Sequence, residues 1–213
     1  MYLNDSIFEI LTPYGTSEKR EKFQNSQYHK KRFMKNVLVT LAPGFEEIET
    51  ITVVDILRRA GARVTLAATV TGVLEGSRGI KVAPDEMLEA VMDKEFDLIC
   101  LPGGQPGTDN LKNDPRIEKL LQKIQSQGKY IAAICAAPTI LLKAGILKDR
   151  SMTCHPSVQS QFDEYLDKRV VIDGKVITSQ SPGTAMEFAL KLVEILFGIE
   201  RMKKVNAGVL ARI

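Results

Sequence analysis

The sequence predicts an α/β fold in which a mostly parallel central sheet carries helices on both faces. Short apolar runs rich in β-branched residues alternate with segments whose apolar residues recur at helical spacing. Glycine or proline marks the end or the start of most of these segments. The 213 residues are enough for one well-buried domain and too few for two of ordinary size.

The first half of the predicted domain contains three strands and a long helix. The helix has apolar residues three and four positions apart and stops at Gly61, a residue type that commonly ends helices. Glycines between two short apolar pairs predict a hairpin, and Pro84 precedes a short helix. In chain order we expect a strand at 35–41, a helix at 46–60, a strand at 63–68, a hairpin over 73–82, a short helix at 85–92 and a strand at 96–101.

The second half repeats the alternation. Asp114 and Pro115 are residue types favoured at the N-cap and the first position of a helix, which closes at Gly128. Asp173-Gly174 between two β-branched runs predicts a second hairpin. In chain order we expect a helix at 114–127, a strand at 130–134, a helix at 136–144, a short strand at 151–153, a hairpin over 170–179 and a helix at 182–197. Strands that alternate with helices predict a parallel sheet, in which ligands bind at the carboxyl ends of the strands.

Residues 1–34 differ from the rest of the chain. They are polar and lack sustained periodicity, so we expect a poorly ordered N-terminal extension before an α/β domain at 35–213. The extension fits a dispensable leader or a misassigned start, because Met34 directly precedes the first strand run. A mitochondrial presequence fits less well, because the extension contains four acidic residues.

Composition and charge exclude several classes of function. Residues 1–35 hold seven Lys and Arg against four Asp and Glu, whereas residues 36–213 hold 22 of each, so no nucleic-acid partner is expected. No apolar run reaches the roughly 18 residues of a membrane helix, and no secretory signal is visible. Three cysteines without a CxxC pair favour a reducing, cytoplasmic location, and with only two histidines a metal site is not expected.

Cys135 is the most informative residue, because it lies where a predicted strand turns into a predicted helix. Backbone N–H groups and the macrodipole at a helix N-terminus favour a thiolate, which is the nucleophilic form of cysteine. We therefore expect the pKa of Cys135 to be lowered, unlike the pKa values of Cys100 and Cys154. Position alone leaves a second interpretation open, because free cysteines are often buried structural residues.

Other residues at strand ends complete a candidate site. Gly104 follows a strand, and its N–H could form an oxyanion hole with the N–H of Ala136. Glu49 opens the first helix beside the expected crevice, where a buried carboxyl would have a raised pKa and could move a proton. The same carboxylate could instead be a solvated partner of the helix dipole. His155 is either a structural residue or the partner of the cysteine.

Five motifs in order resemble the ThiJ/PfpI superfamily, in the branch that contains the parkinsonism-associated protein deglycase and its YajL-type bacterial relatives. The motifs are the segments at 42–50, 101–104, 132–138, 155–156 and 178–184, within a resemblance that covers residues 35 to about 207. The resemblance implies a flavodoxin-like (Rossmann-like) fold, a homodimer, and no metal or organic cofactor. It also implies that Cys135 is an oxidisable nucleophile, that Glu49 is its protonated partner, and that His155 lies nearby.

The resemblance also concerns two arginines and two departures. Arg59 and Arg78 match arginines that lie near the site or the dimer interface in relatives, where they could contact anionic substrate groups. Solvated arginines are an equally good interpretation. Gly76-Ser77 stands where many members carry another cysteine, so a role for that cysteine does not transfer. Gln180-Ser181 replaces an Arg-Gly found in some relatives.

Three functions follow from this resemblance. The first is a cofactor-free, cysteine-dependent glyoxalase or protein deglycase, an enzyme of hydro-lyase or hydrolase type. Its substrates would be methylglyoxal, glyoxal and early dicarbonyl adducts on glycated proteins. The second is a redox-sensing stress protein or chaperone with an oxidisable cysteine. The third and least favoured is a PfpI-type peptidase, which requires a well-placed Cys–His pair.

The extension should be dispensable for folding and turnover, because the first core strand begins at Lys35. A chain that starts at Met34 is expected to melt at the same temperature as the full chain and to have the same activity. Thermal unfolding of the two chains checks this. A large loss of melting temperature on truncation would mean that residues 1–33 pack on the domain.

Overall fold

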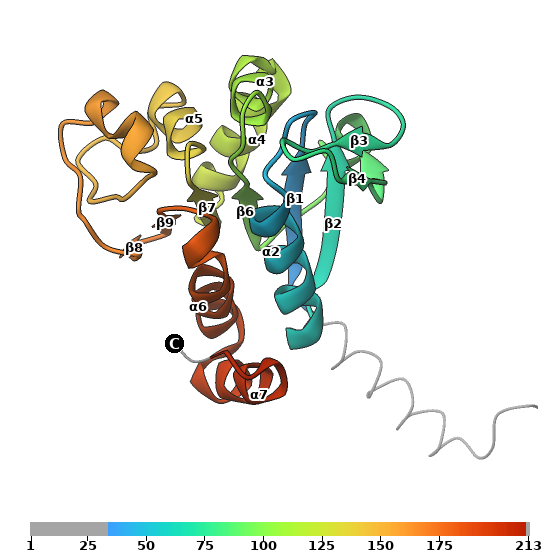
Figure 1. The fold of residues 1–213 in the computed structure, drawn as a ribbon, viewed down its shortest axis with the longest axis vertical. Helices are drawn as coiled ribbons and strands as arrows, with labels where there is room; N and C mark the ends of the chain where they lie inside the picture. Colours follow the sequence, from blue (N-terminus) through green and yellow to red (C-terminus); the bar gives the residue numbers. More distant parts are fainter. Residues whose placement is uncertain (1–33, 212–213) are drawn as a thin grey trace, which may run out of the picture. The chain divides into compact units, whose positions relative to one another are not determined.

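A seven-stranded sheet forms the centre of the computed structural model, which describes residues 34–211 (Figure 1). The strand order is β5-β2-β1-β6-β7-β9-β8. All neighbouring strands are parallel except β8 and β9, which form an antiparallel hairpin. The strands are β1 (Asn36–Leu41), β2 (Arg63–Ala68), β5 (Glu86–Met87), β6 (Leu98–Leu101), β7 (Tyr130–Ile134), β8 (Val170–Asp173) and β9 (Val176–Ser179). The predicted extension at 1–34 lies outside the described residues apart from Met34, and it stays a prediction.

Helices cover both faces of the sheet, and the strands are buried on both faces. Along β1, Val37 and Val39 belong to one hydrophobic core and Leu38 to the other, as the two-residue period of a strand requires. Helices α2 (Glu47–Ala60), α6 (Ala185–Phe197) and α7 (Ile199–Val209) contribute to the first core, and α3 (Gly107–Asn113), α4 (Pro115–Ser126) and α5 (Pro138–Lys143) to the second. Figure 1 shows α2 and α6 next to each other on the same face. Because both faces are covered, the strands are near-continuous apolar runs, which made them predictable.

The loops that carry the candidate residues meet at one edge of the sheet. Strands β1, β6 and β7 are consecutive at its centre and run in the same direction. After β1 the chain crosses to β2 on one side, and β6 lies on the other side, so the strand order reverses between β1 and β6. Such a reversal opens a crevice at the carboxyl ends of the strands.

The predicted hairpin over 73–82 is formed by β3 (Leu74–Glu75) and β4 (Lys81–Val82), which pair with each other in a separate sheet. The segment at 85–92 differs from the predicted helix. Glu86 and Met87 form β5 on the edge of β2, and only Leu88–Val91 turn helically, as a 3₁₀ helix. Asp85 anchors this segment by accepting the N–H of Leu66 at 2.9 Å.

The remaining differences are at helix ends. The helix predicted at 136–144 begins only at Pro138, because Cys135 turns the chain out of the strand first. No strand forms at 151–153. Helices α3 and α7 and a 3₁₀ helix at Pro156–Gln161 were not predicted. Helix α7 was missed because Gly198, which ends α6, also precedes the first residue of α7.

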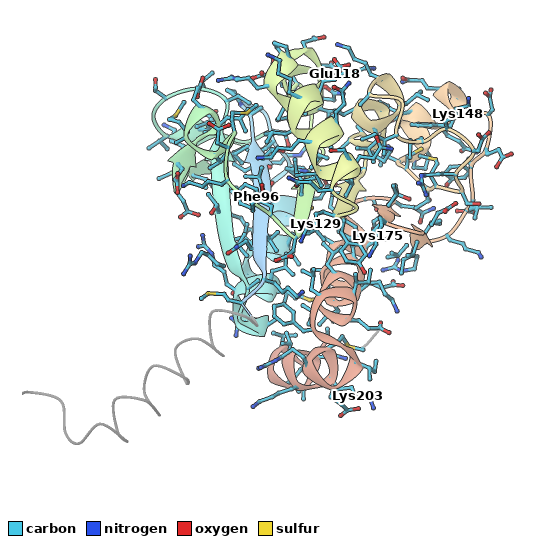
Figure 2. The ribbon with its side chains drawn as sticks, turned by 180° about the vertical axis from the view of Figure 1, so that it is seen from behind. Phe96, Glu118, Lys129, Lys148, Lys175 and Lys203 are labelled. Carbon is cyan, nitrogen blue, oxygen red and sulfur yellow. The ribbon has the colours of Figure 1, made fainter. Side chains whose placement is uncertain are left out.

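Two lysines lie at the edge of the sheet opposite the candidate site. Lys129 immediately precedes β7 and Lys175 immediately precedes β9, so both are at the amino ends of parallel strands (Figure 2). The ammonium of Lys175 lies 3.9 Å from the centre of the Tyr130 ring, and Lys129 donates to Asp97 at 3.0 Å. Both lysines therefore interact with neighbouring side chains at the amino ends of the strands, away from the crevice at the carboxyl ends. Within residues 34–211, no helix combines the length and apolar character needed to cross a membrane.

Candidate active site

Cys135 lies directly after β7 in a strained conformation. Its φ of 65° is in the left-handed region, which costs a residue other than glycine about 1–2 kcal/mol. Two hydrogen bonds hold it there: its N–H donates to the carbonyl of Ser179 at 3.0 Å, and its carbonyl accepts the N–H of His155 at 2.8 Å. The turn leaves the thiol partly exposed, whereas Cys100 and Cys154 are buried.

Glu49 is fully buried in the first turn of α2, and its carboxyl lies beside the Cys135 side chain at Gly103. Its Oε2 accepts the N–H of Gly103 at 2.7 Å. Its Oε1 has no hydrogen-bond partner among the described residues. A buried oxygen without a donor is better tolerated when the carboxyl is protonated, because the neutral acid requires fewer hydrogen bonds than the anion.

Gly103 is the point where the sheet, α2 and the cysteine approach most closely. A Cβ atom at this position would lie 2.6 Å from Cys135 Cβ and 2.8 Å from Glu49 Oε2. These are distances that real side chains do not adopt without moving the neighbouring atoms. A glycine is therefore required for Glu49 and Cys135 to lie side by side.

The N–H groups of Gly104 and Ala136 both donate toward the Cys135 sulfur. Gly104 has a φ of +93°, and a Cβ atom there would lie 2.4 Å from the backbone nitrogen of Glu46. The Gly104 N–H therefore comes from backbone that packs tightly against the start of α2, whereas the Ala136 N–H belongs to the turn after β7. This is the pair predicted to form an oxyanion hole, and the structure brings both to the sulfur.

Burial dominates the proton affinities at the site. The pKa of Glu49 is raised to about 7, first by burial and also by the negative charge of Glu46, while the N–H of Gly103 and the neighbouring Cys135 side chain lower it. Burial likewise raises the pKa of the Cys135 thiol, and a charged Glu49 raises it further, against the N–H groups of Ala136 and Gly104. This corrects the prediction that a strand-to-helix turn alone would lower the pKa of Cys135. Burial raises the pKa of Cys154 to about 11 and that of Cys100 as well.

His155 is brought near Cys135 by its backbone but not by its ring. Its Nδ1 lies 2.8 Å from Ser157 Oγ and accepts the N–H of Ser157 at 3.2 Å. Among residues 34–211, no hydrogen bond joins the imidazole to the Cys135 sulfur. The ring therefore caps the 3₁₀ helix that follows it.

The two predicted arginines do not reach the cysteine. Arg59 lies in the last turn of α2, ten residues beyond Glu49 and therefore about 15 Å along the helix, and its guanidinium bonds to Asp55 at 3.0 Å. Arg78 is exposed between β3 and β4, and its backbone N–H donates to Glu47 at 2.6 Å. The charge of Arg78 lowers the pKa of Glu46, so this arginine lies near the start of α2.

Two carboxylates near the site were not singled out in the sequence. Glu46 and Glu47 stand at the start of α2, where acidic residues are ordinarily solvated partners of the helix dipole, yet both are buried. Glu47 accepts the N–H groups of Arg78 and Ile80 and the hydroxyl of Ser77, which ties the β3–β4 hairpin to α2. Burial opposes ionisation of Glu47, but these N–H groups bring its pKa below the usual value. The signal that was available is the three-residue spacing of Glu46 and Glu49, which is typical of an N-cap.

Within residues 34–211, no three His, Cys, Asp or Glu side chains are grouped as metal ligands would be.

Comparison with known proteins identifies the family of this sequence. The model of the DJ-1/PfpI family matches residues 35–195. Dj-1beta of Drosophila melanogaster is 44% identical over 181 residues, which cover 83% of this chain and 97% of that protein.

Two more relatives extend the comparison. The glutathione-independent glyoxalase DJR-1.2 of Caenorhabditis elegans is 45% identical over 172 residues, which cover 78% of this chain and 91% of that protein. Among solved structures, oxidized DJ-1 of Toxoplasma gondii aligns with a TM-score of 0.82 at 38% identity and covers 84% of this chain and all of that one. The flavodoxin-like α/β fold expected from the sequence is thereby confirmed.

Gly103→Ala should damage the site because the added Cβ would displace Cys135 or Glu49. We expect a loss of about 1–3 kcal/mol in the free energy of unfolding, as for other overpacked positions, and slower alkylation of Cys135. Gly183→Ala is the matched control, since its Cβ would meet nothing closer than 3.9 Å. Equal effects of the two substitutions, measured by denaturant unfolding and mass spectrometry, would contradict the crowding at Gly103.

Cys135 should become reactive as the pH rises through the first ionisation of the Cys135–Glu49 pair, because burial holds the proton of Glu49 above the usual carboxyl range. Below that pH both groups are protonated and no thiolate is present; above it the pair has lost one proton. The measurement is the rate of iodoacetamide alkylation at each cysteine against pH. A rise centred near the usual cysteine value of about 8.5, or equal rates at Cys100 and Cys154, would show that the pair does not titrate together.

Proposed function

Because the chain belongs to the DJ-1/PfpI family, we propose that it is a cysteine-dependent glyoxalase that needs neither glutathione nor a cofactor. Its substrates are methylglyoxal and glyoxal, and early dicarbonyl adducts on proteins are attacked in the same way. The observation that carries this proposal is the contact between the Cys135 thiol and the buried carboxyl of Glu49. The printed name of the Caenorhabditis elegans relative supports the same chemistry.

The active form of the pair has its charge on sulfur and its proton on Glu49. A group raises the proton affinity of its neighbour only while it is itself charged, so the pair holds on to its last proton and then carries one negative charge. The sulfur is partly exposed and receives two N–H groups, whereas Glu49 is fully buried and lies beside the negative charge of Glu46. The anion is therefore better solvated on Cys135.

The first step is addition of the Cys135 thiolate to the aldehyde carbon of methylglyoxal. A carbon–sulfur bond forms, the carbonyl π electrons move to oxygen, and that oxygen takes the proton from Glu49. The product is a hemithioacetal, and Glu49 becomes a carboxylate. The N–H groups of Gly104 and Ala136 stabilise the negative charge that develops on the oxygen.

The second step is an internal redox change that needs no external oxidant. The Glu49 carboxylate removes the proton from the carbon bound to sulfur, which gives an enediolate, and returns that proton to the neighbouring carbon. The hydroxyl proton of the hemithioacetal passes from the first oxygen to the former ketone oxygen. The former aldehyde carbon is oxidised to a thioester while the ketone is reduced to an alcohol. Water then cleaves the thioester, which releases lactate and regenerates the thiol. Glyoxal gives glycolate by the same route.

A peptidase is less well supported by these contacts. Such a mechanism requires a base that takes the proton of the nucleophile, and the ring of His155 is bonded to Ser157 rather than to the sulfur. His155 thus has a positioning role, because its backbone N–H holds the carbonyl of Cys135.

We further propose that the enzyme is a cytoplasmic homodimer. Ile48 and Ile51 are exposed on one side of α2, and Val73 and Ile80 are exposed on the hairpin that Glu47 ties to it. Four exposed apolar side chains near one another are typical of an interface. Arg78 belongs to the same hairpin, so a role for it at the interface remains compatible with its position.

A redox-sensing role uses the same cysteine and is the second candidate. The N–H groups of Gly104 and Ala136 could stabilise the oxygens of a Cys135 sulfinate as they would a substrate oxyanion. A relative was solved in a form named as oxidized. The partial exposure of Cys135, against the burial of the other two cysteines, favours its selective oxidation.

The proposal is tested by lactate formation from methylglyoxal without glutathione. Wild type should form lactate, and Cys135→Ser should lose at least about 1,000-fold because the nucleophile is absent. Glu49→Gln should lose about 100-fold or more while Cys135 still alkylates, because the amide cannot move a proton. Arg59→Ala is the control expected to match wild type.

Normal turnover by Cys135→Ser would contradict the proposed enzyme. Absence of lactate from wild type, together with a gain of two oxygens on the Cys135 peptide after mild peroxide, would favour the redox sensor instead.

A further inference from the structure

A closed ring of three hydrogen bonds connects the start of α2 to the turn after β6. The N–H of Glu46 donates to the carbonyl of Gly103 at 2.9 Å, and the N–H of Gly103 donates to Glu49 Oε2 at 2.7 Å. The N–H of Glu49 donates to Glu46 Oε2 at 2.7 Å and closes the ring. Each member gives one donor and one acceptor, so displacement of one residue breaks two of the three bonds.

Glu46 is the member of this ring that the proposed reaction does not use. Its side chain is buried, and it lies at the N-cap of α2, where its backbone is extended. Burial raises the pKa of Glu46, whereas the N–H groups of Glu49 and Ile48 favour its carboxylate form. A carboxylate in this position adds a negative charge within hydrogen-bond distance of the backbone of Glu49.

On the basis of the function proposed above, we propose that Glu46 is a positioning residue of this site. Its carboxylate closes the ring that holds Glu49 against Gly103, and its charge keeps the remaining proton on Glu49 rather than on the Cys135 sulfur. Glu46 does not touch the reacting atoms, so it acts only through Glu49. Such a residue sets the pH at which the cysteine becomes nucleophilic.

The other charged and titratable groups around the pair do not replace Glu46. On the side of the hairpin, Arg78 and Glu47 act on Glu46 with opposite signs. On the side of β6, Cys100 faces Glu49, but burial and the charge of Glu49 raise the pKa of this thiol, which therefore stays neutral. Among the described residues, Glu46 is the one whose negative charge raises the pKa of Glu49.

The Glu46→Gln variant separates the charge of Glu46 from its hydrogen bond. The amide oxygen still accepts the N–H of Glu49, but the negative charge is gone, so the Cys135–Glu49 pair releases its first proton at lower pH. The midpoint of the rise in Cys135 alkylation should move to lower pH by about 0.5–1 unit. Glu46→Ala removes the acceptor as well, so its alkylation rate on the high-pH plateau should fall by roughly tenfold or more.

Glu47→Gln is the matched control, because it removes the same charge from the adjacent residue. The carboxylate of Glu47 points to the hairpin and accepts no bond from the ring. The experiment is the pH profile of iodoacetamide alkylation at Cys135 in the full chain, for wild type and the three variants. Circular dichroism checks that each variant folds. If Glu46→Ala does not fold, the alkylation midpoints of Glu46→Gln and Glu47→Gln alone test the proposal.

A lowered midpoint in Glu46→Gln with an unchanged midpoint in Glu47→Gln is the expected result. An unchanged midpoint in Glu46→Gln, or an equal shift in Glu47→Gln, would overturn the proposal. Alkylation requires no dicarbonyl substrate. The alkylation profile therefore tests the role of Glu46 independently of the glyoxalase activity. Failure of the glyoxalase proposal would instead appear as absence of lactate from wild type.

Discussion

The close approach of backbone at Gly103 and Gly104 is the constraint on which the site depends. The turn after β6 passes so near to α2 and to Cys135 that a methyl group at either glycine would overlap the neighbouring atoms. This approach allows one N–H to bind Glu49 and the next to reach the sulfur. The parallel sheet brings the carboxyl ends of β1, β6 and β7 to one edge, so the residues that follow these strands meet there. Fold and chemistry are therefore linked through a turn without side chains.

Burial gives the pair its chemistry. A carboxyl and a thiol in water would each titrate at their usual pKa, and the carboxyl would be ionised long before the thiol. In this site burial raises the pKa of Glu49 to about 7, so the carboxyl retains its proton into the neutral range. The sulfur is the less buried member and has two N–H donors, and it is the better place for the single negative charge. An acid beside a nucleophile at neutral pH is what addition to an aldehyde requires.

The sequence predicted the parts of the fold and site that depend on local patterns. Apolar runs located the central strands, the turn from strand to helix pointed to Cys135 and Ala136, and the glycine turn after another strand pointed to Gly104. The pKa direction of Cys135 was wrong, because the helix N-terminus is visible in the sequence whereas burial results from the packing of distant elements. Arg59 was expected from resemblance near the site or the dimer interface; helical rise places it about 15 Å along α2 from Glu49, so only the interface role stays a prediction. Glu46 was overlooked because its ring closes through Gly103, which is distant in the sequence.

The location of the single proton tests this account most directly. Infrared difference spectroscopy of wild type minus Glu49→Gln isolates the carboxyl band of Glu49, and it can be recorded at about pH 8, above the first ionisation of the pair. The account predicts a protonated Glu49 carboxyl at this pH, because the negative charge of the Cys135 thiolate holds the proton on Glu49, together with a thiolate absorption that disappears in Cys135→Ser. A carboxylate band for Glu49 with a neutral Cys135 thiol at the same pH would contradict it.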